Sequence, residues 1–330
     1  MFRLICAIMV VSIHTRPFSE INSSLGYFFE NIFPLIGVPF FFAIAGYYYL
    51  GSLMSGKKVF IKYTKKLLIV YSLWSAIYFL ILFFQLVVFG NYSIVTYIYQ
   101  RIISYFILGS YYHFWFFPAL FFSIITATVC YKMKLLKVLA YASIPLYIIG
   151  CLGCSYYAMG AQIPGISSLI NLSVFTIVRR VLFSGLPFFM IGYFLHAVKP
   201  KLDKLGNKKL YFAIGLTLIL MLLEIFFIIK LGLQKNIIVT IFLYILLFLV
   251  IAFLINNPLS EMSSVGRKTR IISNFMYYSH PLFLQIIRFL MHPLKMPKYG
   301  TACFFLTVGA TIVVGLIIEK VNNKWLNKLV

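Results

Sequence analysis

Ten apolar runs recur along the chain, and this pattern constrains its possible folds more than any other feature. The runs cover residues 2–15, 29–50, 66–90, 111–131, 136–153, 181–198, 210–229, 236–255, 271–291 and 301–320. Most are close to the roughly 20 residues with which a helix crosses a hydrocarbon core about 30 Å thick. Inside a bilayer, backbone polar groups must be satisfied without water, which helices achieve within one segment. We therefore expect an all-α, polytopic membrane bundle of about ten transmembrane helices.

The composition excludes a soluble protein. Hydrophobic residues make up 62% of the 330 positions, and charged residues only 11%. Soluble domains carry about 25% charged residues. The first apolar run begins at the start of the chain and is followed by further runs, which does not fit a cleavable signal peptide. No stretch is long or polar enough for a separate soluble domain, so we expect one transmembrane domain over residues 1–330.

Two segments between the runs have a different character. In residues 93–109, tyrosine, glutamine and arginine interrupt the apolar pattern, which favours an interfacial helix over a span. Residues 155–178 contain Gly160, Pro164 and Gly165, and we expect a loop there with at most a short helix.

The charged residues predict an orientation. The chain carries 29 Lys and Arg against 6 Asp and Glu, for a net charge of +23. If the N-terminus is cytoplasmic, twenty of the 29 basic residues fall on the cytoplasmic side and nine on the other. This bias predicts that both termini are cytoplasmic. Topology and contact with anionic membrane lipids account for the excess charge, so we expect no nucleic-acid partner.

The five cysteines predict neither a disulfide framework nor a metal centre. Cys151 and Cys154 form a C-x-x-C pair, but no second pair and no nearby histidine completes a zinc site. We expect both to pack in apolar surroundings, and we expect no metal.

Arg3 and His14 lie in the first apolar run, where charge is expensive. Eleven helical steps of about 100° return to within about 20° of the start, so the two side chains share one helix face. The histidine is a candidate general base, although a structural histidine bonded to a carbonyl is the common alternative. The arginine suits an inner-end anchor or a phosphate ligand. Together they predict a functional site.

A basic loop precedes the third apolar run. It contains Lys57, Lys58, Lys62, Lys65 and Lys66. Such a loop is often only topological and lipid-facing. However, Lys62 and Lys65 share one helix face, where a polyphosphate could dock.

Three further groups are candidates on the remaining runs. Arg179 and Arg180 precede run 181–198 and suit an acidic acceptor. His280 is flanked by three hydroxyl residues, which predicts either a functional site or a structural network. These neighbours are Tyr277, Tyr278 and Ser279.

Two carboxylates, Glu30 and Glu224, have apolar neighbours in the sequence. We expect either to pair with a histidine or an arginine, and the sequence does not say which.

No Gly-rich phosphate loop, nucleophile elbow or zinc motif is present. Several segments, taken in order, resemble the acyltransferase type 3 family of integral membrane acyltransferases. They are R-x10-H at Arg3 and His14, GVPFFFAIAGYYY, FIKYTKKLLIVYSLWS, HFWFFPAL, RRVLFSGLPFFMIGY and YYSHPLF. Each segment alone is weak, and their shared order across nearly the whole chain is specific.

The resemblance implies a multi-pass domain of the bacterial cytoplasmic membrane that takes an acyl group from cytoplasmic acyl-CoA. Acetyl-CoA is the expected donor, and a hydroxyl of an envelope glycan or lipid-linked sugar is the expected acceptor. His14 falls on the family histidine, the general base, and Arg3 on the family arginine. The family R-x-x-R is K-x-x-K here, at Lys62 and Lys65, which keeps the charge but loses the bidentate fork.

The resemblance also assigns supporting roles. We expect Lys62, Lys65 and Lys66 to hold the phosphates of acyl-CoA. The acceptor is expected to contact a second set of residues: Arg179, Arg180, Tyr278 and His280.

Within this family, the motif IHT-x-PF is also similar to the membrane half of vancomycin-resistance serine racemases. That similarity implies an alternative function, transport of serine or a similar small solute. The sequence stops soon after the last run, so we expect either a whole acyltransferase or the membrane domain of a longer protein. A non-catalytic scaffold in envelope assembly is a third possibility, and it predicts that substitutions of His14 are silent.

Overall fold

The structure is a computed structural model that describes residues 1–89, 93–202, 206–257, 264–294, 297–321 and 323. All regular secondary structure in these residues is helical, so the all-α prediction is confirmed for them. The last residue of the predicted run 66–90 lies outside the described residues.

Each of the ten predicted runs overlaps one long helix, because an apolar run of this length favours a helix. These helices are α1 (Phe2–Thr15), α3 (Gly37–Met54), α4 (Phe60–Phe89), α6 (Phe116–Lys132), α7 (Leu136–Leu152), α11 (Leu186–Leu202), α12 (Asn207–Lys230), α13 (Ile241–Asn256), α14 (Ser264–Met291) and α15 (Thr301–Val321).

Five helical stretches in the described part of the chain are long and apolar enough to cross a membrane. They are Ser23–Met54, Phe60–Phe84, Phe175–Leu202, Asn207–Lys230 and Thr301–Val321. Helices α1, α6, α7 and α13 are also apolar but have only 14 to 17 residues. The chain therefore has the helices of a multi-pass membrane protein, whereas ten spans and cytoplasmic termini remain predictions.

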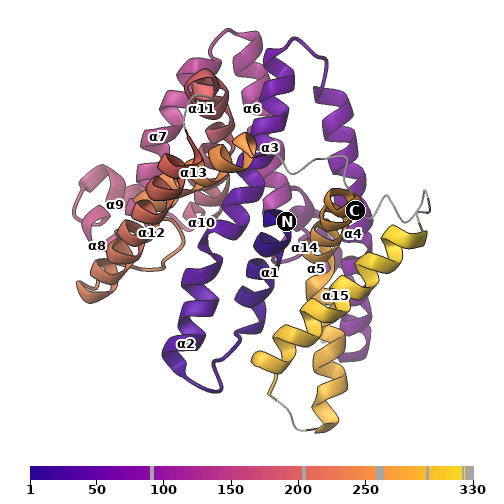
Figure 1. Cartoon of the computed structure of the whole chain (residues 1–330). Coiled ribbons are helices and arrows are strands. Elements are labelled where there is room, and N and C mark those ends of the chain that lie inside the picture. Colours follow the sequence, from indigo (N-terminus) through magenta and orange to yellow (C-terminus); the bar gives the residue numbers. More distant parts are fainter. Residues whose placement is uncertain (90–92, 203–205, 258–263, 295–296, 322, 324–330) are drawn as a thin grey trace. The chain divides into compact units, whose positions relative to one another are not determined.

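The residues divide into two compact units. The first combines Met1–Phe40 with the described residues from Asn257 onward, and the second is Phe41–Asn256. In the first unit, α14 and α15 pack along each other and α1 packs against both (Figure 1). Gly315 permits this, because a Cβ there would lie 3.2 Å from the Cα of Ile272.

The start of α3 in the first unit is reached through three short helical turns. Helix α2 (Ser23–Tyr27) is capped by the side chain of Asn22, which accepts a hydrogen bond from the N–H of Leu25 at 3.0 Å. A π-helical turn, η1 (Phe28–Ile32), and a 3-10 turn, η2 (Phe33–Ile36), follow. Such π-helical turns occur frequently at functional sites.

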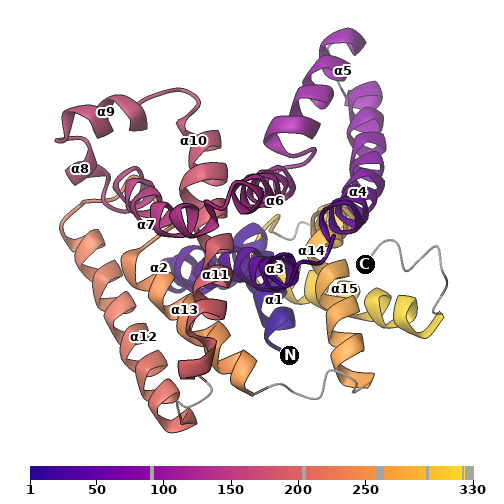
Figure 2. The same ribbon diagram turned by 90° about the horizontal axis from the view of Figure 1, so that it is seen from above.

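In the second unit, α11 packs against α6, α7 and α13, and α12 pairs with α13 (Figure 2). Helices α3 and α11 approach closely at Gly46 and Gly192, where an added Cβ would collide with the backbone of the other helix. Small residues permit such close approach between apolar helices. Nearby, the hydroxyl groups of Tyr49 and Thr128 hydrogen-bond at 2.6 Å in the interior.

Both segments between the runs contain helices, as predicted for 93–109, whereas 155–178 has more helix than expected. Residues 93–109 form α5 (Ile94–Ile103) and the π-helical turn η3 (Ser104–Leu108). They turn back along α4, which shows in Figure 2 and in a hydrogen bond from the Tyr97 hydroxyl to the carbonyl of Phe79 at 2.9 Å. A location at the membrane interface stays a prediction.

The second segment, 155–178, contains three short helices where at most one was expected. They are α8 (Tyr157–Gly160), α9 (Pro164–Ile170) and α10 (Phe175–Val178). The last leads directly into the π-helical turn η4 (Arg179–Gly185) and α11, so the expected loop ends as the start of a long helix.

The cysteines are free thiols in the described part of the chain, and Cys151 and Cys154 are buried. No group of three or more potential ligands among the described residues is arranged to hold a metal ion.

Candidate functional site

His14 lies in the last turn of α1. The helix ends at Arg16, whose φ of 52° places it in the left-handed region, and the N–H of Arg16 donates to the carbonyl of Ser12. The hydroxyl of Thr15 donates to the carbonyl of Val11 at 2.9 Å, within the same helix. His14 therefore projects from a well-formed helix end rather than from a loop.

The structure brings His14 and His280 together. Their rings stack with centroids 5.3 Å apart and planes 17° apart, and His280 is fully buried on α14. The Nδ1 atom of His280 lies 3.1 Å from the carbonyl oxygen of Met276 and 3.0 Å from that of Tyr277. Carbonyls only accept hydrogen bonds, so Nδ1 carries the proton, and in the neutral ring Nε2 is the basic nitrogen. Two histidines distant in sequence thus form one polar centre.

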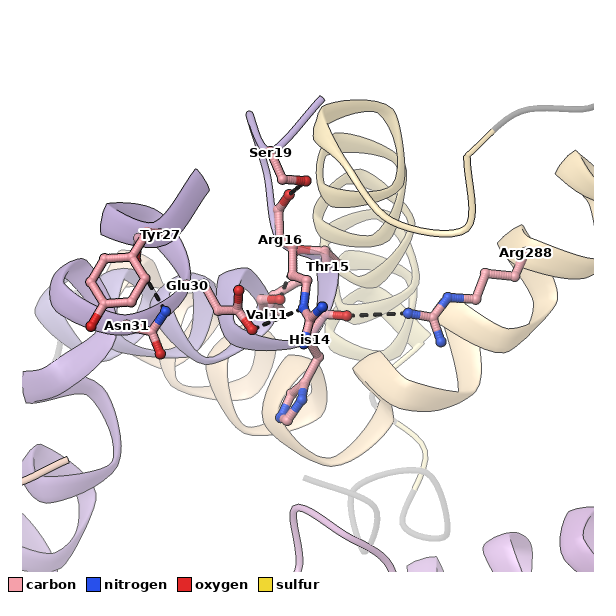
Figure 3. Close-up of polar contacts among 9 residues, drawn as sticks. All are labelled: Val11, His14, Thr15, Arg16, Ser19, Tyr27, Glu30, Asn31 and Arg288. Atoms are coloured by element: carbon pink, nitrogen blue, oxygen red, sulfur yellow. Dashed lines mark hydrogen bonds and ion pairs between the residues drawn. The ribbon is translucent and has the colours of Figure 1, made fainter. Parts of the chain in front are cut away.

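Arg288 fixes the backbone of this centre and was missed by the sequence reasoning. Its Nη2 donates to the carbonyl of His14 at 3.2 Å, and its Nε donates to the carbonyl of Lys298 at 2.8 Å. Figure 3 shows the imidazole of His14 pointing away from the carbonyl that Arg288 holds. The usable signal was the one that singled out Arg3, an arginine within a predicted apolar run, here 271–291.

Tyr299 and Glu30 contact the two arginines near His14, Arg16 and Arg288. The guanidinium of Arg288 lies 4.3 Å from the centroid of the Tyr299 ring, and that of Arg16 lies 5.2 Å from it. Glu30, on the π-helical turn η1, pairs with Arg16 at 2.8 Å (Figure 3). The expectation that Glu30 pairs with a histidine or an arginine is therefore confirmed, with Arg16 as the partner.

The loop after α1 is tied to the start of α15. Glu20 accepts a hydrogen bond from the N–H of Thr301 at 2.7 Å, and the N–H of Gly300 donates to the carbonyl of Thr15 at 2.7 Å. Desolvation alone would raise the pKa of the Glu20 carboxyl, but the hydrogen bonds from Thr301 bring it below its ordinary value. This ionised cap helps to hold α1 and α15 together beside His14.

Arg3 is on the same helix as His14 but not in contact with it. Helix α1 is unbroken, so the two residues share a face as predicted. Eleven residues of rise separate them by about 16 Å. Arg3 therefore does not belong to the His14–His280 contact.

Of the hydroxyl residues beside His280, the serine bonds within its own helix and the tyrosines contact each other. The hydroxyl of Ser279 donates to the carbonyl of Phe275 at 2.7 Å, inside its own helix. The ring of Tyr277 lies 6.5 Å from that of His280, and the rings of Tyr277 and Tyr278 meet edge to face. The ring of His280 thus lies closer to that of His14 than to that of Tyr277.

The other predicted residues belong to the second unit. Lys62, Lys65 and Lys66 are exposed on the first turns of α4. A helix N-terminus attracts anions, and the three lysines add positive charge to it.

Arg179 and Arg180 begin the π-helical turn η4. Arg179 is buried, with 7% of its surface exposed, and the guanidinium of Arg180 lies 5.5 Å from the centroid of the Trp115 ring. This ring contact joins the start of η4 to Trp115, the residue that precedes α6.

Glu224 has a structural role that the sequence reasoning did not predict. Its carboxylate accepts hydrogen bonds from the Tyr156 hydroxyl at 2.5 Å and from the N–H groups of Ile241 and Phe242 at 2.6 and 3.0 Å. These two N–H groups are at the N-terminus of α13, which favours a negative charge. Among the described residues, Glu224 thus binds a tyrosine and two backbone N–H groups, and not the histidine or arginine that was expected.

Comparison with known families gives a match over nearly the whole chain. The family model described as an acyltransferase domain matches residues 1–319. No solved structure matches.

Curated relatives match only in part. Two proteins named amino-acid racemase, both from Enterococcus faecalis, are 31% and 27% identical over 66% and 64% of this chain and over 32% and 29% of their own lengths. A serine/alanine racemase of Enterococcus gallinarum is 28% identical over 49% of this chain and 24% of its own length. The chain thus spans about a third or less of the length of these relatives.

Proposed function

The chain belongs to the acyltransferase family whose model covers residues 1–319, and from this premise we propose that it transfers an acyl group with His14 as the general base. The donor is acyl-CoA from the cytoplasm, with acetyl-CoA the simplest case. The acceptor is a hydroxyl of an envelope glycan or lipid-linked sugar. The reaction takes place in a bacterial cytoplasmic membrane. The observation that carries the proposal is the stacked pair of His14 and His280.

His14 takes the proton of the acceptor hydroxyl as the oxygen attacks the thioester carbonyl. The tetrahedral intermediate then collapses, the carbon–sulfur bond breaks, and CoA leaves as the thiol with the proton returned by His14. A neutral imidazole is needed for the first step. A second imidazole in parallel contact supports it, because two protonated rings at 5.3 Å would repel each other in an apolar interior.

His280 and Arg288 act as positioning residues in this proposal. His280 is itself fixed by the carbonyls of Met276 and Tyr277, so it offers a rigid surface for the His14 ring. Arg288 holds the carbonyl of His14 and thereby the end of α1. Rigid support of this kind is what a catalytic base requires to stay in reach of its proton.

The donor and the acceptor are assigned to cationic residues. Lys62, Lys65 and Lys66 bind the phosphates of acyl-CoA, supported by their exposure at the N-terminus of α4. Arg3 holds the CoA moiety or stabilises developing negative charge. Arg179 and Arg180 are assigned to the acceptor, supported by the π-helical turn on which they lie, and Tyr278 joins them.

The test is transfer of label from [14C]acetyl-CoA to lipid-linked glycans by the purified protein in proteoliposomes. His14→Ala is expected to lower the rate about 100-fold or more, the usual contribution of a general base. The matched control is His292→Ala, which removes an exposed histidine of the turn η5 (His292–Leu294). Undiminished transfer by His14→Ala would exclude the base assignment, and so would an equal loss in the control.

A second function is favoured by the names of the curated relatives. Amino-acid racemases and a serine/alanine racemase match part of this chain. The alternative is that the membrane domain carries serine or a similar small solute, with the same histidine pair as the binding site. It predicts uptake of serine into proteoliposomes without any acyl-CoA, and loss of that uptake in His14→Ala.

A further inference from the structure

A cavity of the second unit plays no part in the proposed transfer. It lies between α4 and the segment of α5 and η3, and its volume is about 360 Å³. This size is within the range of small-molecule sites in proteins. Its lining combines hydroxyl groups, one arginine and large apolar side chains, which is an unusual mixture for two apolar helices.

The spacing of the residues explains why the cavity exists. On α4, the lining residues Ser72, Ser75 and Ala76 are small and are spaced i, i+3, i+4, so they form one face. On α5 and η3, Arg101 and Tyr105 are spaced i, i+4 and form the opposing face. Small side chains facing long ones leave an unfilled space.

The hydroxyl groups of the lining are hydrogen-bonded to one another. The Ser72 and Tyr105 hydroxyls lie 2.7 Å apart, and those of Ser75 and Ser110 lie 2.6 Å apart. These pairs hold α4 to η3 and to the residues that follow it. The hydroxyls therefore shape the cavity and leave recognition to the remaining polar group.

That remaining group is Arg101. Its Nε is buried and has no hydrogen-bond partner among the described residues. The guanidinium lies 5.7 Å from the centroid of the Tyr97 ring, and no ion pair joins it to a described carboxylate. An arginine beside an apolar helix long enough to span a membrane is costly unless an anion compensates it.

The apolar part of the lining shows what kind of anion fits. Phe79 of α4 and Ile98, Ile102 and Phe106 of α5 and η3 face the same space. A hydrocarbon chain is stabilised by leaving water for such surroundings, whereas a free hydrophilic anion is not. We propose that this cavity binds an anionic membrane lipid, with its phosphate on Arg101 and an acyl chain along the four apolar side chains.

This site differs from the acyl-CoA site in chemistry and in residues. The lysines of the proposed donor site are exposed on the first turns of α4, whereas Arg101 is partly buried on α5. The lipid is bound and is not a substrate. Lipid binding can therefore be tested independently of the proposed acyl transfer.

The test is lipid binding by the purified chain in a neutral detergent, measured by native mass spectrometry and by the shift of the melting temperature. The probes are dioleoyl phosphatidic acid, dioleoyl phosphatidylcholine and inorganic phosphate. Phosphatidic acid is expected to bind and to raise the melting temperature, with much weaker effects from the other two. Equal stabilisation by inorganic phosphate would overturn the lipid assignment, and equal binding of phosphatidylcholine would overturn the anionic one.

Two variants locate the site. Arg101→Gln is expected to weaken binding of phosphatidic acid about tenfold, because it removes charge-assisted hydrogen bonds to phosphate. The matched control is Lys230→Gln, which removes another cation that lies over an aromatic ring four residues earlier, Phe226 at 5.8 Å. Unchanged binding by Arg101→Gln, or an equal loss in the control, would contradict the proposal.

Ala76→Phe keeps Arg101 and fills the cavity from the side of α4. It is expected to reduce lipid binding at least as much as the loss of Arg101, while the protein melts at or above the wild-type temperature in lipid-free detergent. Full binding by this variant would overturn the cavity as the site, even if Arg101→Gln failed to fold.

Discussion

Arg288 and Arg101 each lie over a tyrosine ring, but the chain treats them differently. The donors of Arg288 go to the carbonyls of His14 and Lys298. The Nε of Arg101 is buried with no hydrogen-bond partner among the described residues. Neither forms an ion pair with a described carboxylate.

The difference separates two uses of a charge in an apolar setting. A cation whose hydrogen bonds end on backbone carbonyls is a structural tie, and here it fixes the helix end that carries His14. A cation with a donor that no described residue accepts from, such as Arg101, is available to a ligand. Each charge is costly to desolvate, so the contacts that compensate it indicate its role.

The largest effect on stability is expected from Arg288→Gln. It removes two charge-assisted hydrogen bonds and should lower the free energy of unfolding by about 2 kcal/mol, measured by SDS titration in mixed micelles. Arg101→Gln loses the contact with the Tyr97 ring and no hydrogen bond from Nε to a described residue, so it should cost about 0.5 kcal/mol. Similar losses in both variants would break the distinction.

The control for this comparison is Arg270→Gln, which removes an exposed arginine from the same helix as Arg288. It should leave the unfolding free energy within about 0.5 kcal/mol of the wild type. A loss as large as that of Arg288→Gln would mean that the charge of α14, and not the two hydrogen bonds, is what matters.

Glu224→Gln extends the comparison to an acid whose oxygens are all used by the chain. The amide keeps the shape but removes the negative charge from the N-terminus of α13 and weakens three hydrogen bonds. We expect the unfolding free energy to fall by about 1 to 1.5 kcal/mol. Glu319→Gln, at the end of α15, removes the same charge and is expected to be neutral. If the two variants have the same free energy of unfolding, the contacts of Glu224 with the N-terminus of α13 contribute nothing to stability.

The smallest effect is expected at Glu20, on the loop between α1 and α2. Its pKa is lowered in the folded protein, so its contribution to stability is present above the ordinary glutamate pKa. That contribution is lost as the pH falls through the lowered value. Glu20→Gln should therefore flatten the melting temperature between neutral and acidic pH. An unchanged acid dependence would show that the link to Thr301 does not contribute.

The sequence predicted the positions of the helices well because an apolar run is a local property. Helix α1 covers Phe2–Thr15 for a predicted 2–15, and α15 covers Thr301–Val321 for a predicted 301–320. The sequence also predicted correctly that Arg3 and His14 share one face of α1, since this depends only on helical geometry.

The pairings between helices could not be predicted in this way. Arg288 meets His14 across 274 residues of sequence, and nothing local to either residue indicates the other. Glu224 was expected to find a cation and instead caps α13, because the helix N-terminus offers the same positive potential without a charged residue. The π-helical turns at Glu30 and Arg179 also have no signature in the apolar pattern.

One experiment tests most directly whether this centre transfers groups or passes solutes. Proteoliposomes with the wild-type chain receive [14C]acetyl-CoA, lipid-linked glycans and [3H]serine together. The account predicts 14C in the glycan fraction, dependent on His14, and no more luminal 3H than in protein-free liposomes. Accumulation of serine with the acetyl-CoA left intact would contradict it.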